Sequence, residues 1–139
     1  MVLAAVGKNG TGKDFFLEYV AKNYGFPMIS IGDVVRELAT NDGLELTREN
    51  LHATSKKYMT AYGQDFFPKQ IIKKIKESDA PCYLVSGIRP PSDAQLFKDA
   101  FGEDFFLESI PHIETTASNA IIKNSGTYFF IFILSSTFF

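Results

Sequence analysis

The chain has 139 residues, of which 45% are hydrophobic and 22% charged, and its formal net charge is −2. These totals fit one globular domain with one hydrophobic core and argue against general disorder. A net charge this small gives no overall attraction to nucleic acid or to an anionic membrane, so any phosphate binding must come from a few local groups.

Cys82 is the single cysteine, so the chain can form no internal disulfide. One cysteine is also too few for a cysteine-based zinc site. It lies in the apolar run CYLV, where a buried structural thiol is the expected role. No positively charged, apolar leader opens the chain, so no secretory signal is predicted and the cytoplasm is the expected compartment.

Strand and helix patterns alternate along the first half of the chain. The apolar run VLAAV predicts a buried strand at residues 2–6, and residues 14–24 then carry apolar positions at helical spacing. PMISI predicts a second strand at residues 27–31. We expect a helix to open at Asp33 and run through VVRELA, and a longer helix to follow from an N-cap at Thr47 to about residue 62.

The alternation continues in the second half. A helix is expected at residues 68–77, with its proline tolerated in the first turn, and CYLVS predicts a strand at 82–86. Ser92 and Gln95 fit a capping box at the start of the next helix, and DFFLESI predicts a strand at 104–110. This alternation predicts an α/β fold in which a parallel sheet is covered by helices on both faces, giving three layers.

A glycine-rich segment lies between the first predicted strand and the first predicted helix. It satisfies the P-loop pattern G-x-x-x-x-G-K, with residues Gly7, Lys8, Asn9, Gly10, Thr11, Gly12 and Lys13. In such a loop, backbone N–H groups and the positive end of the helix face phosphate oxygens, and Lys13 would reach the β- and γ-phosphates of ATP. A dinucleotide fingerprint would need glycine where Phe15 stands. The segment therefore predicts a nucleotide site in a P-loop NTPase-type fold.

Asp14 departs from the usual P-loop pattern, because a hydroxyl that contacts Mg²⁺ is expected directly after the lysine. The carboxylate expected at the end of the third strand is in turn replaced by Ser86. One interpretation is an exchange that leaves one carboxylate and one hydroxyl near the metal, since Mg²⁺ favours oxygen ligands and retains several waters. The other is that Asp14 only stabilises the N-terminus of its helix.

Two further stretches resemble nucleoside monophosphate kinases. ISIGDVVRELA is similar to that family's I-S-T-G-D pattern with its following arginine, and VSGIRPPSDAQLF resembles its D-G-hydrophobic-x-R stretch after the third strand. Together with the P-loop and LTRENL, residues 1 to about 110 most resemble small adenylate-kinase-like P-loop proteins, dephospho-CoA-kinase-like members included.

The resemblance implies roles for matching positions. Lys13, Arg36 and Arg89 would be catalytic: the lysine would act on ATP, and the two arginines would hold the phosphate of a phosphorylated small-molecule acceptor. Gly32, Asp33 and Gly87 would line the acceptor site, and ATP and Mg²⁺ would be the cofactors. Phosphoryl transfer needs mainly positioning and charge neutralisation, so no dedicated base is required.

A second resemblance is to animal-type phosphomevalonate kinases. That family carries G-K-D-F and V-S-D-x-R-x-x-S-D, similar to GKDF and VSGIRPPSD here. It offers a precedent for both Asp14 and Ser86 in an active phosphotransferase. Gly87 and Pro90 depart from its pattern, so phosphomevalonate is ranked as the second choice of acceptor.

The first 110 residues are predicted to form the P-loop domain, whereas residues 111–139 form an atypical tail. This tail is polar up to Gly126 and then rich in phenylalanine. Three interpretations stay open: a last core strand, a non-native end caused by truncation or a frameshift, and an interfacial membrane contact. YFFIFIL is too short to span a bilayer, which needs about 20 residues.

No arginine follows Ile110, and Lys123 is the only lysine there, so the arginine-bearing lid of monophosphate kinases is missing or degenerate. Transfer of the ATP γ-phosphoryl group is the function predicted. The alternatives are nucleotide binding without turnover and, third, a membrane-associated module anchored by the tail. Lysine pairs are not interleaved with aromatics, so a nucleic-acid partner is not expected. The oligomeric state is not indicated.

Overall fold

The computed structural model describes residues 1–7 and 10–110. The expectations for Lys8, for Asn9 and for the tail at residues 111–139 therefore lie outside the described residues.

Four parallel strands form a single sheet. They are β1 (Val2–Val6), β2 (Met28–Ser30), β3 (Tyr83–Ser86) and β4 (Phe105–Ser109), and their order across the sheet is β2-β3-β1-β4. Val2 of β1 pairs with Tyr83 on one side and Phe105 on the other. The parallel sheet predicted from the alternating pattern is confirmed, and all four strands point their carboxyl ends at the same edge.

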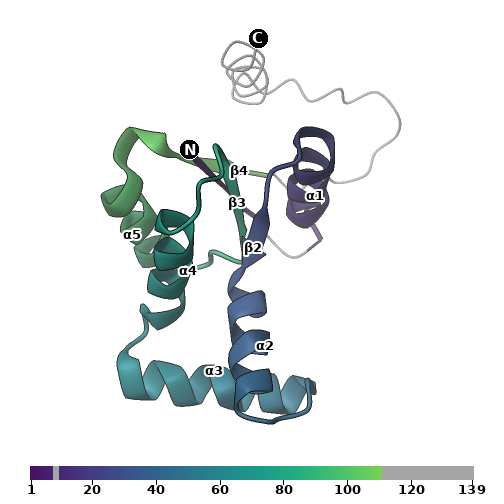
Figure 1. The fold of residues 1–139 in the computed structure, drawn as a ribbon, viewed down its shortest axis with the longest axis vertical. Helices are drawn as coiled ribbons and strands as arrows, with labels where there is room; N and C mark the ends of the chain where they lie inside the picture. The colour runs from purple at the N-terminus through teal and green to yellow at the C-terminus, as the bar shows by residue number, and fades with distance from the viewer. Residues whose placement is uncertain (8–9, 111–139) are drawn as a thin grey trace.

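Helices cover both faces of this sheet. Figure 1 shows α1 (Lys13–Tyr24) on one side, with α4 (Phe66–Lys76) and α5 (Pro91–Phe101) on the other. Neighbouring residues of β1 point to opposite faces, so Leu3 packs in the core beneath α1 and Val2 packs in the core beneath α4 and α5. The three-layer α/β/α architecture is confirmed.

Two helices extend away from the sheet beyond the end of β2. They are α2 (Ile31–Asn41) and α3 (Arg48–Tyr62), which lie at the bottom of Figure 1. Val34, Val35 and Ala39 anchor α2, whereas α3 buries only Thr54. Lys57 donates to Asp42 across 2.8 Å and ties α3 to the end of α2.

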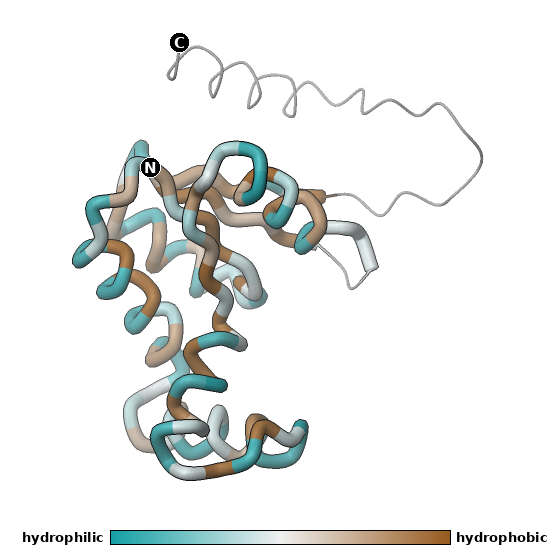
Figure 2. The backbone as a smooth tube through the Cα atoms, turned by 45° about the vertical axis from the view of Figure 1, so that its right-hand side comes forward, coloured by the Kyte–Doolittle hydropathy of each residue, from teal (hydrophilic) through white to brown (hydrophobic). Residues whose placement is uncertain are grey.

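Apolar residues concentrate in the strands and in the helix faces that cover them, as Figure 2 shows. Cys82 belongs to this interior: only 1% of it is exposed, and burial raises the pKa of its thiol to about 11. The prediction of a buried structural cysteine is confirmed. Among residues 1–7 and 10–110, no helix combines the length and the apolar character needed to cross a bilayer.

Three predicted helix starts are wrong. α2 begins at Ile31 rather than Asp33, because Ser30 caps it and Asp33 completes a capping box from the third position. α4 begins at Phe66 and places Pro68 in its first turn. α5 begins at Pro91 with no side-chain cap, so Ser92 and Gln95 form no capping box. Gln95 instead donates to Asp99 across 2.7 Å, one turn further along. The short 3₁₀ helix η1 (Gly102–Asp104) then leads into β4.

Candidate functional site

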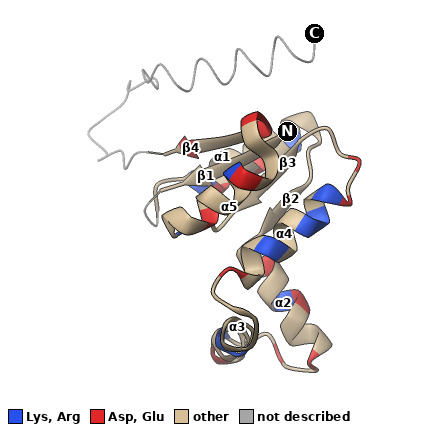
Figure 3. Ribbon diagram, turned by 90° about the vertical axis from the view of Figure 1, so that its left-hand side faces the viewer, with Lys and Arg blue, Asp and Glu red and all other residues tan. Residues whose placement is uncertain are grey.

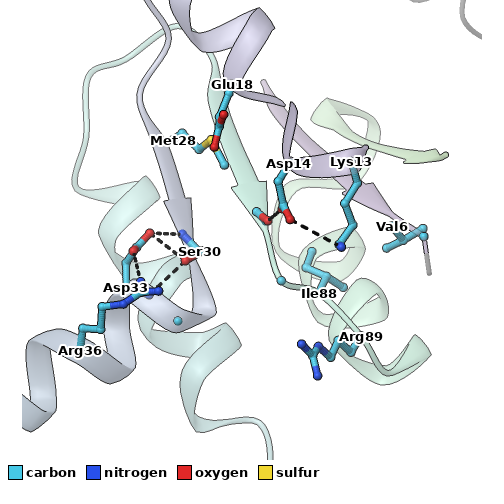
Figure 4. Close-up of a pocket in the computed structure, with 14 residues that line it drawn as sticks. Val6, Lys13, Asp14, Glu18, Met28, Ser30, Asp33, Arg36, Ile88 and Arg89 are labelled. Atoms are coloured by element: carbon cyan, nitrogen blue, oxygen red, sulfur yellow. Dashed lines mark hydrogen bonds and ion pairs between the residues drawn. The ribbon is translucent and has the colours of Figure 1, made fainter. Parts of the chain in front are cut away.

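A cavity of about 1130 Å³ opens at the carboxyl edge of the sheet. Three segments meet around it: the glycine loop after β1, the start of α2 after β2, and the loop from Gly87 to Arg89 after β3 (Figure 4). Parallel strands deliver their following loops to one edge, so residues far apart in the sequence come together here.

The glycine loop needs its glycines for conformational reasons. Gly10 and Gly12 have φ angles of 83° and 84°, in the left-handed region that other residues rarely adopt. Gly7 has no such angle, but a Cβ there would lie 2.8 Å from the carbonyl oxygen of Ile110. Gly12 is also the N-cap of α1 and has no side chain to satisfy the helix N-terminus. The first turn of α1 therefore presents backbone N–H groups at the cavity mouth.

Lys13, Asp14 and Ser86 form a connected group on the wall between β1 and β3. The Lys13 side chain is mostly buried, and its Nζ lies 3.6 Å from Oδ2 of Asp14. The buried Ser86 donates from Oγ to Oδ1 of Asp14 across 2.6 Å. Asp14 and Ser86 are therefore in contact, as expected if this carboxylate and this hydroxyl have exchanged places at a metal site.

The second wall carries Ser30, Gly32, Asp33 and Arg36 at the start of α2. Asp33 accepts from the Ser30 backbone N–H and from the Ser30 hydroxyl, both at 2.8 Å, and the Ser30 Oγ accepts from the Asp33 N–H at 3.0 Å. Arg36 donates from Nη1 to Asp33 Oδ1 across 2.6 Å. Figure 4 shows this group across the cavity from Asp14 and Lys13.

The third wall is the loop that follows β3. Gly87 has a φ of 86°, and a Cβ there would lie 3.4 Å from the backbone nitrogen of Ile31, so this loop packs closely on the start of α2. Arg89 lines the cavity two residues later. Asp93 follows in α5, and burial raises the pKa of its carboxyl group. A hydrogen bond from the Arg89 backbone N–H acts in the opposite direction, whereas the charge of Asp65 raises this pKa further.

The structure brings most of the predicted site residues to this one cavity. Its lining includes Gly7, Lys13, Asp14, Gly32, Asp33, Arg36, Ser86, Gly87 and Arg89. Gly10, Thr11 and Gly12 belong to the adjoining loop but are not part of that lining. Which ligand each of the predicted site residues binds stays a prediction.

Sequence reasoning did not single out five of the residues that line the cavity, namely Val6, Glu18, Met28, Ser30 and Ile88. Ser30 holds Asp33, and the S-x-x-D spacing before a helix could have revealed this capping box. Glu18 lies four residues after Asp14, on the same face of α1, so helical spacing could have placed it at the cavity. Met28, at the start of β2, carries no such signal in the sequence.

Charges of both signs are interspersed over the helices in the part of the chain that the structure describes (Figure 3). On α4, for example, Lys69 pairs with Asp65 at 2.5 Å and Lys73 with Glu77 at 3.9 Å. Among the described residues, the cations that line the cavity are Lys13, Arg36 and Arg89. These three cations are the local positive charge at this cavity, and their use in binding a phosphate compound stays a prediction.

A parallel sheet of order β2-β3-β1-β4, with a G-x-x-x-x-G-K loop between β1 and α1, defines an α/β protein of the P-loop type. The family model described as AAA domain matches residues 6–124. The chain belongs to this AAA domain family.

Several archaeal proteins are similar to the chain. It is 41% identical over 111 residues to a UPF0200/UPF0201 protein of Archaeoglobus fulgidus, covering 78% of this chain and 34% of that protein. It is 33% identical over 106 residues to a UPF0200 protein of Thermococcus gammatolerans, covering 75% and 55%. A UPF0200 protein of Methanoculleus marisnigri is 33% identical over 125 residues, covering 90% and 67%. The chain thus spans from about a third to two thirds of the length of these relatives.

Two solved structures show a distant likeness. A gluconokinase from Sinorhizobium meliloti has a TM-score of 0.48 and 17% identity, covering 78% of this chain and 55% of that one. A shikimate kinase from Aquifex aeolicus has a TM-score of 0.42 and 14% identity, covering 72% and 55%. The fold assignment depends on strand order and loop position, and neither likeness contributes to it.

Proposed function

We propose that this chain is an ATP-dependent phosphotransferase that transfers the γ-phosphoryl group to a phosphorylated small-molecule acceptor. The observation that supports it is the pairing of a P-loop lysine with two arginines around one cavity. Lys13 stands on one wall, and Arg36 and Arg89 stand on the other two. Arginine offers planar, bidentate recognition of phosphate, which suits an acceptor that already carries one.

The residues present fit ATP. Left-handed glycines at positions 10 and 12 and the uncapped first turn of α1 supply the curved row of N–H groups that a polyphosphate needs. Lys13 would hold the β- and γ-phosphates as a single positive charge.

Mg²⁺ would be held at Asp14 and Ser86. Among the described residues, no group of three or more His, Cys, Asp or Glu could enclose a metal ion. The magnesium ion would take the Asp14 carboxylate and the Ser86 hydroxyl from the protein and would otherwise use phosphate oxygens and water. Bound there, Mg²⁺ would neutralise charge that develops on the phosphates.

Substitution of Lys13 tests the proposal. Lys13→Ala should abolish transfer and weaken ATP binding by about ten- to hundredfold, since a charge-assisted hydrogen bond contributes roughly 1.5–3 kcal/mol. Lys22→Ala, at the other end of α1, is the matched control and should leave both unchanged. Wild-type transfer by the Lys13 variant would refute the proposal.

The acceptor can be sought with a panel of nucleoside monophosphates, dephospho-CoA and phosphomevalonate, with ATP and Mg²⁺. Nucleoside monophosphates and dephospho-CoA come first because the S-x-G-D-x-x-R group lies intact on the second wall. Phosphomevalonate is the runner-up, and the contact of Ser86 with Asp14 favours it, because the GKDF resemblance pairs those same residue types.

The second candidate function is nucleotide binding without turnover. The observation that favours it is the altered metal corner of the P-loop, where Asp14 stands in the position of the usual magnesium-binding hydroxyl and Ser86 in that of the usual carboxylate. ATP binding with no product from any acceptor in the panel would favour this candidate.

A further inference from the structure

We propose that Asp33 is a positioning residue, which holds the Arg36 guanidinium at the cavity wall in the orientation that binds the acceptor and does not itself contact the acceptor. This inference rests on the proposed function, because it assumes that Arg36 receives the acceptor phosphate. It replaces the expectation that Asp33 belongs to the acceptor-binding set.

Both carboxylate oxygens of Asp33 already have partners within the protein. Oδ2 accepts from the backbone N–H and the hydroxyl of Ser30, and Oδ1 accepts from Arg36. A carboxylate offers about four acceptor positions, so little of this one is left for a ligand. Its negative charge would also repel an acceptor phosphate. Asp33 is therefore suited to acting through Arg36.

The anchoring of Asp33 distinguishes this ion pair from an ordinary surface pair. An exposed pair contributes little because two long side chains must be held in place. Here the carboxylate is fixed by a reciprocal capping box at the first turn of α2, at 2.8 Å and 3.0 Å. One partner is thus rigid, and only the arginine remains to be ordered.

Gly32 leaves room for the guanidinium on a second side, because it has no side chain. A Cβ built on Gly32 would lie 3.5 Å from Nη1 and 3.6 Å from Nη2 of Arg36, so the planar group lies directly over this glycine. A longer side chain there would occupy the space of the guanidinium. Of the five N–H donors of an arginine, the hydrogen bond to Asp33 uses one, which leaves donors for a bidentate phosphate.

A purely structural role would explain only half of these contacts. A helix cap accounts for the bonds between Asp33 and Ser30 but not for the bond to Arg36. Asp33→Glu separates the two roles, because glutamate is a preferred residue at this position of a capping box. The longer side chain can keep the cap, yet it moves the carboxylate away from its present contact with the guanidinium.

The first measurement uses the free protein and needs no substrate. The chain has three arginines, Arg36, Arg48 and Arg89, so ¹⁵N relaxation of their Nε–Hε groups can be assigned with Arg36→Lys. Arg36 should be ordered in the wild type and should fall below an order parameter of about 0.6 in Asp33→Glu. Asp65→Asn, which breaks a similar helical pair away from the cavity, is the control and should not change Arg36.

The second measurement is kinetic. Asp33→Glu should raise the acceptor KM about tenfold with a smaller change in kcat, while the KM for ATP and the melting temperature stay at wild-type values. In an Arg36→Ala background, the same change should add no further loss, because Asp33 then has nothing to position. Asp33→Asn serves as the second variant if the glutamate protein does not fold.

An Arg36 that is mobile in the wild type, or equally ordered in both proteins, would overturn the inference. Independent, multiplying losses from Asp33→Glu and Arg36→Ala would do so as well. Should the wild type show no turnover with any acceptor, the proposed function fails while the relaxation data still decide whether Asp33 positions Arg36.

Discussion

Asp14 contacts both Lys13 and Ser86, and these contacts bear on the proposed Mg²⁺ site. Ser86 donates to one of its oxygens, and Lys13 lies 3.6 Å from the other. A carboxylate in contact with a buried hydroxyl at the carboxyl end of β3 is placed where a P-loop site has its metal ligands. The alternative role, stabilisation of the α1 N-terminus, needs neither contact.

Asp14→Ala should therefore reduce the gain in ATP affinity that Mg²⁺ provides. Titration calorimetry with and without Mg²⁺ measures that gain in the wild type and the variant. Ser86→Ala leaves the carboxylate but removes its hydrogen-bond donor, so it should give an intermediate loss. If Mg²⁺ improves ATP binding equally in wild type and Asp14→Ala, the metal-ligand role is excluded.

Cys82 makes the free energy of unfolding depend on pH, and the burial of its thiol sets the direction of this dependence. Burial raises the pKa of the thiol from 9.0 to about 11, so the folded state holds this proton more tightly than the unfolded state. The neutral thiol therefore contributes to the stability of the folded state. This contribution is fully present below pH 9 and is lost as pH rises from 9 towards 11.

Two measurements test this prediction. The native protein should react slowly with a thiol reagent at pH 8, and the urea-unfolded protein should react at once. Cys82→Ala should show a shallower loss of unfolding free energy between pH 9 and pH 11 than the wild type. Rapid labelling of the native protein would contradict the burial of this side chain.

At the scale of elements, two helices begin with a hydroxyl cap, and the caps differ in strength. Ser30 accepts from Asp33 and also donates to its carboxylate, so it takes part in a reciprocal pair. Thr47 accepts a single, longer bond of 3.2 Å from Asn50. The Ser30 cap also starts α2, whose buried residues pack in the main core.

Ser30→Ala should cost about 1 kcal/mol or more of unfolding free energy, and Thr47→Ala should cost less. Urea denaturation of the two variants and the wild type measures both costs. An equal or greater loss in Thr47→Ala would show that the reciprocal bond adds nothing at Ser30.

The element boundaries show which sequence signals were informative. Thr47 was identified as an N-cap because it precedes a helical pattern directly, and the structure confirms it. Ser92 carried a similar signal but lies inside α5, because proline with its preset φ can occupy the first helical position and start the helix earlier. Ser30 was missed because its apolar neighbours read as a strand, and it does end β2.

The site was predictable where a motif fixes local spacing and not where the fold joins distant residues. The glycine loop and Lys13 follow from G-x-x-x-x-G-K alone. The contact of Ser86 with Asp14, 72 residues apart, depends on β3 lying beside β1, and alternation of strands and helices does not fix that order. The bond from Arg36 to Asp33 lies at helical spacing, but the spacing alone does not show that the two side chains are in contact.

At the scale of the whole molecule, the described residues form two packed cores, one on each face of the sheet. One core packs α1 against Leu3, Ala5 and Leu84, and the other packs α2, α4 and α5 against Val2, Ala4 and Val85. The four strands that the structure describes, and the described residues that line the cavity, come from the first 110 residues. The proposed boundary at residue 110 follows the end of β4 by one residue.

A fragment of residues 1–110 should therefore unfold cooperatively and bind ATP. At a hundredfold excess of ATP over its Kd, binding should stabilise the fragment by about 2.7 kcal/mol, and the full chain should gain the same amount. Thermal unfolding followed by circular dichroism, with and without ATP and Mg²⁺, measures the gain. The fragment with Lys13→Ala is the control and should gain little, because its loop lacks the lysine that holds the phosphates.

A fragment that melts without a cooperative transition would show that residues beyond 110 are needed to complete the domain. A cooperative fragment that ATP fails to stabilise, beside a full chain that it does stabilise, would place part of the nucleotide site beyond residue 110.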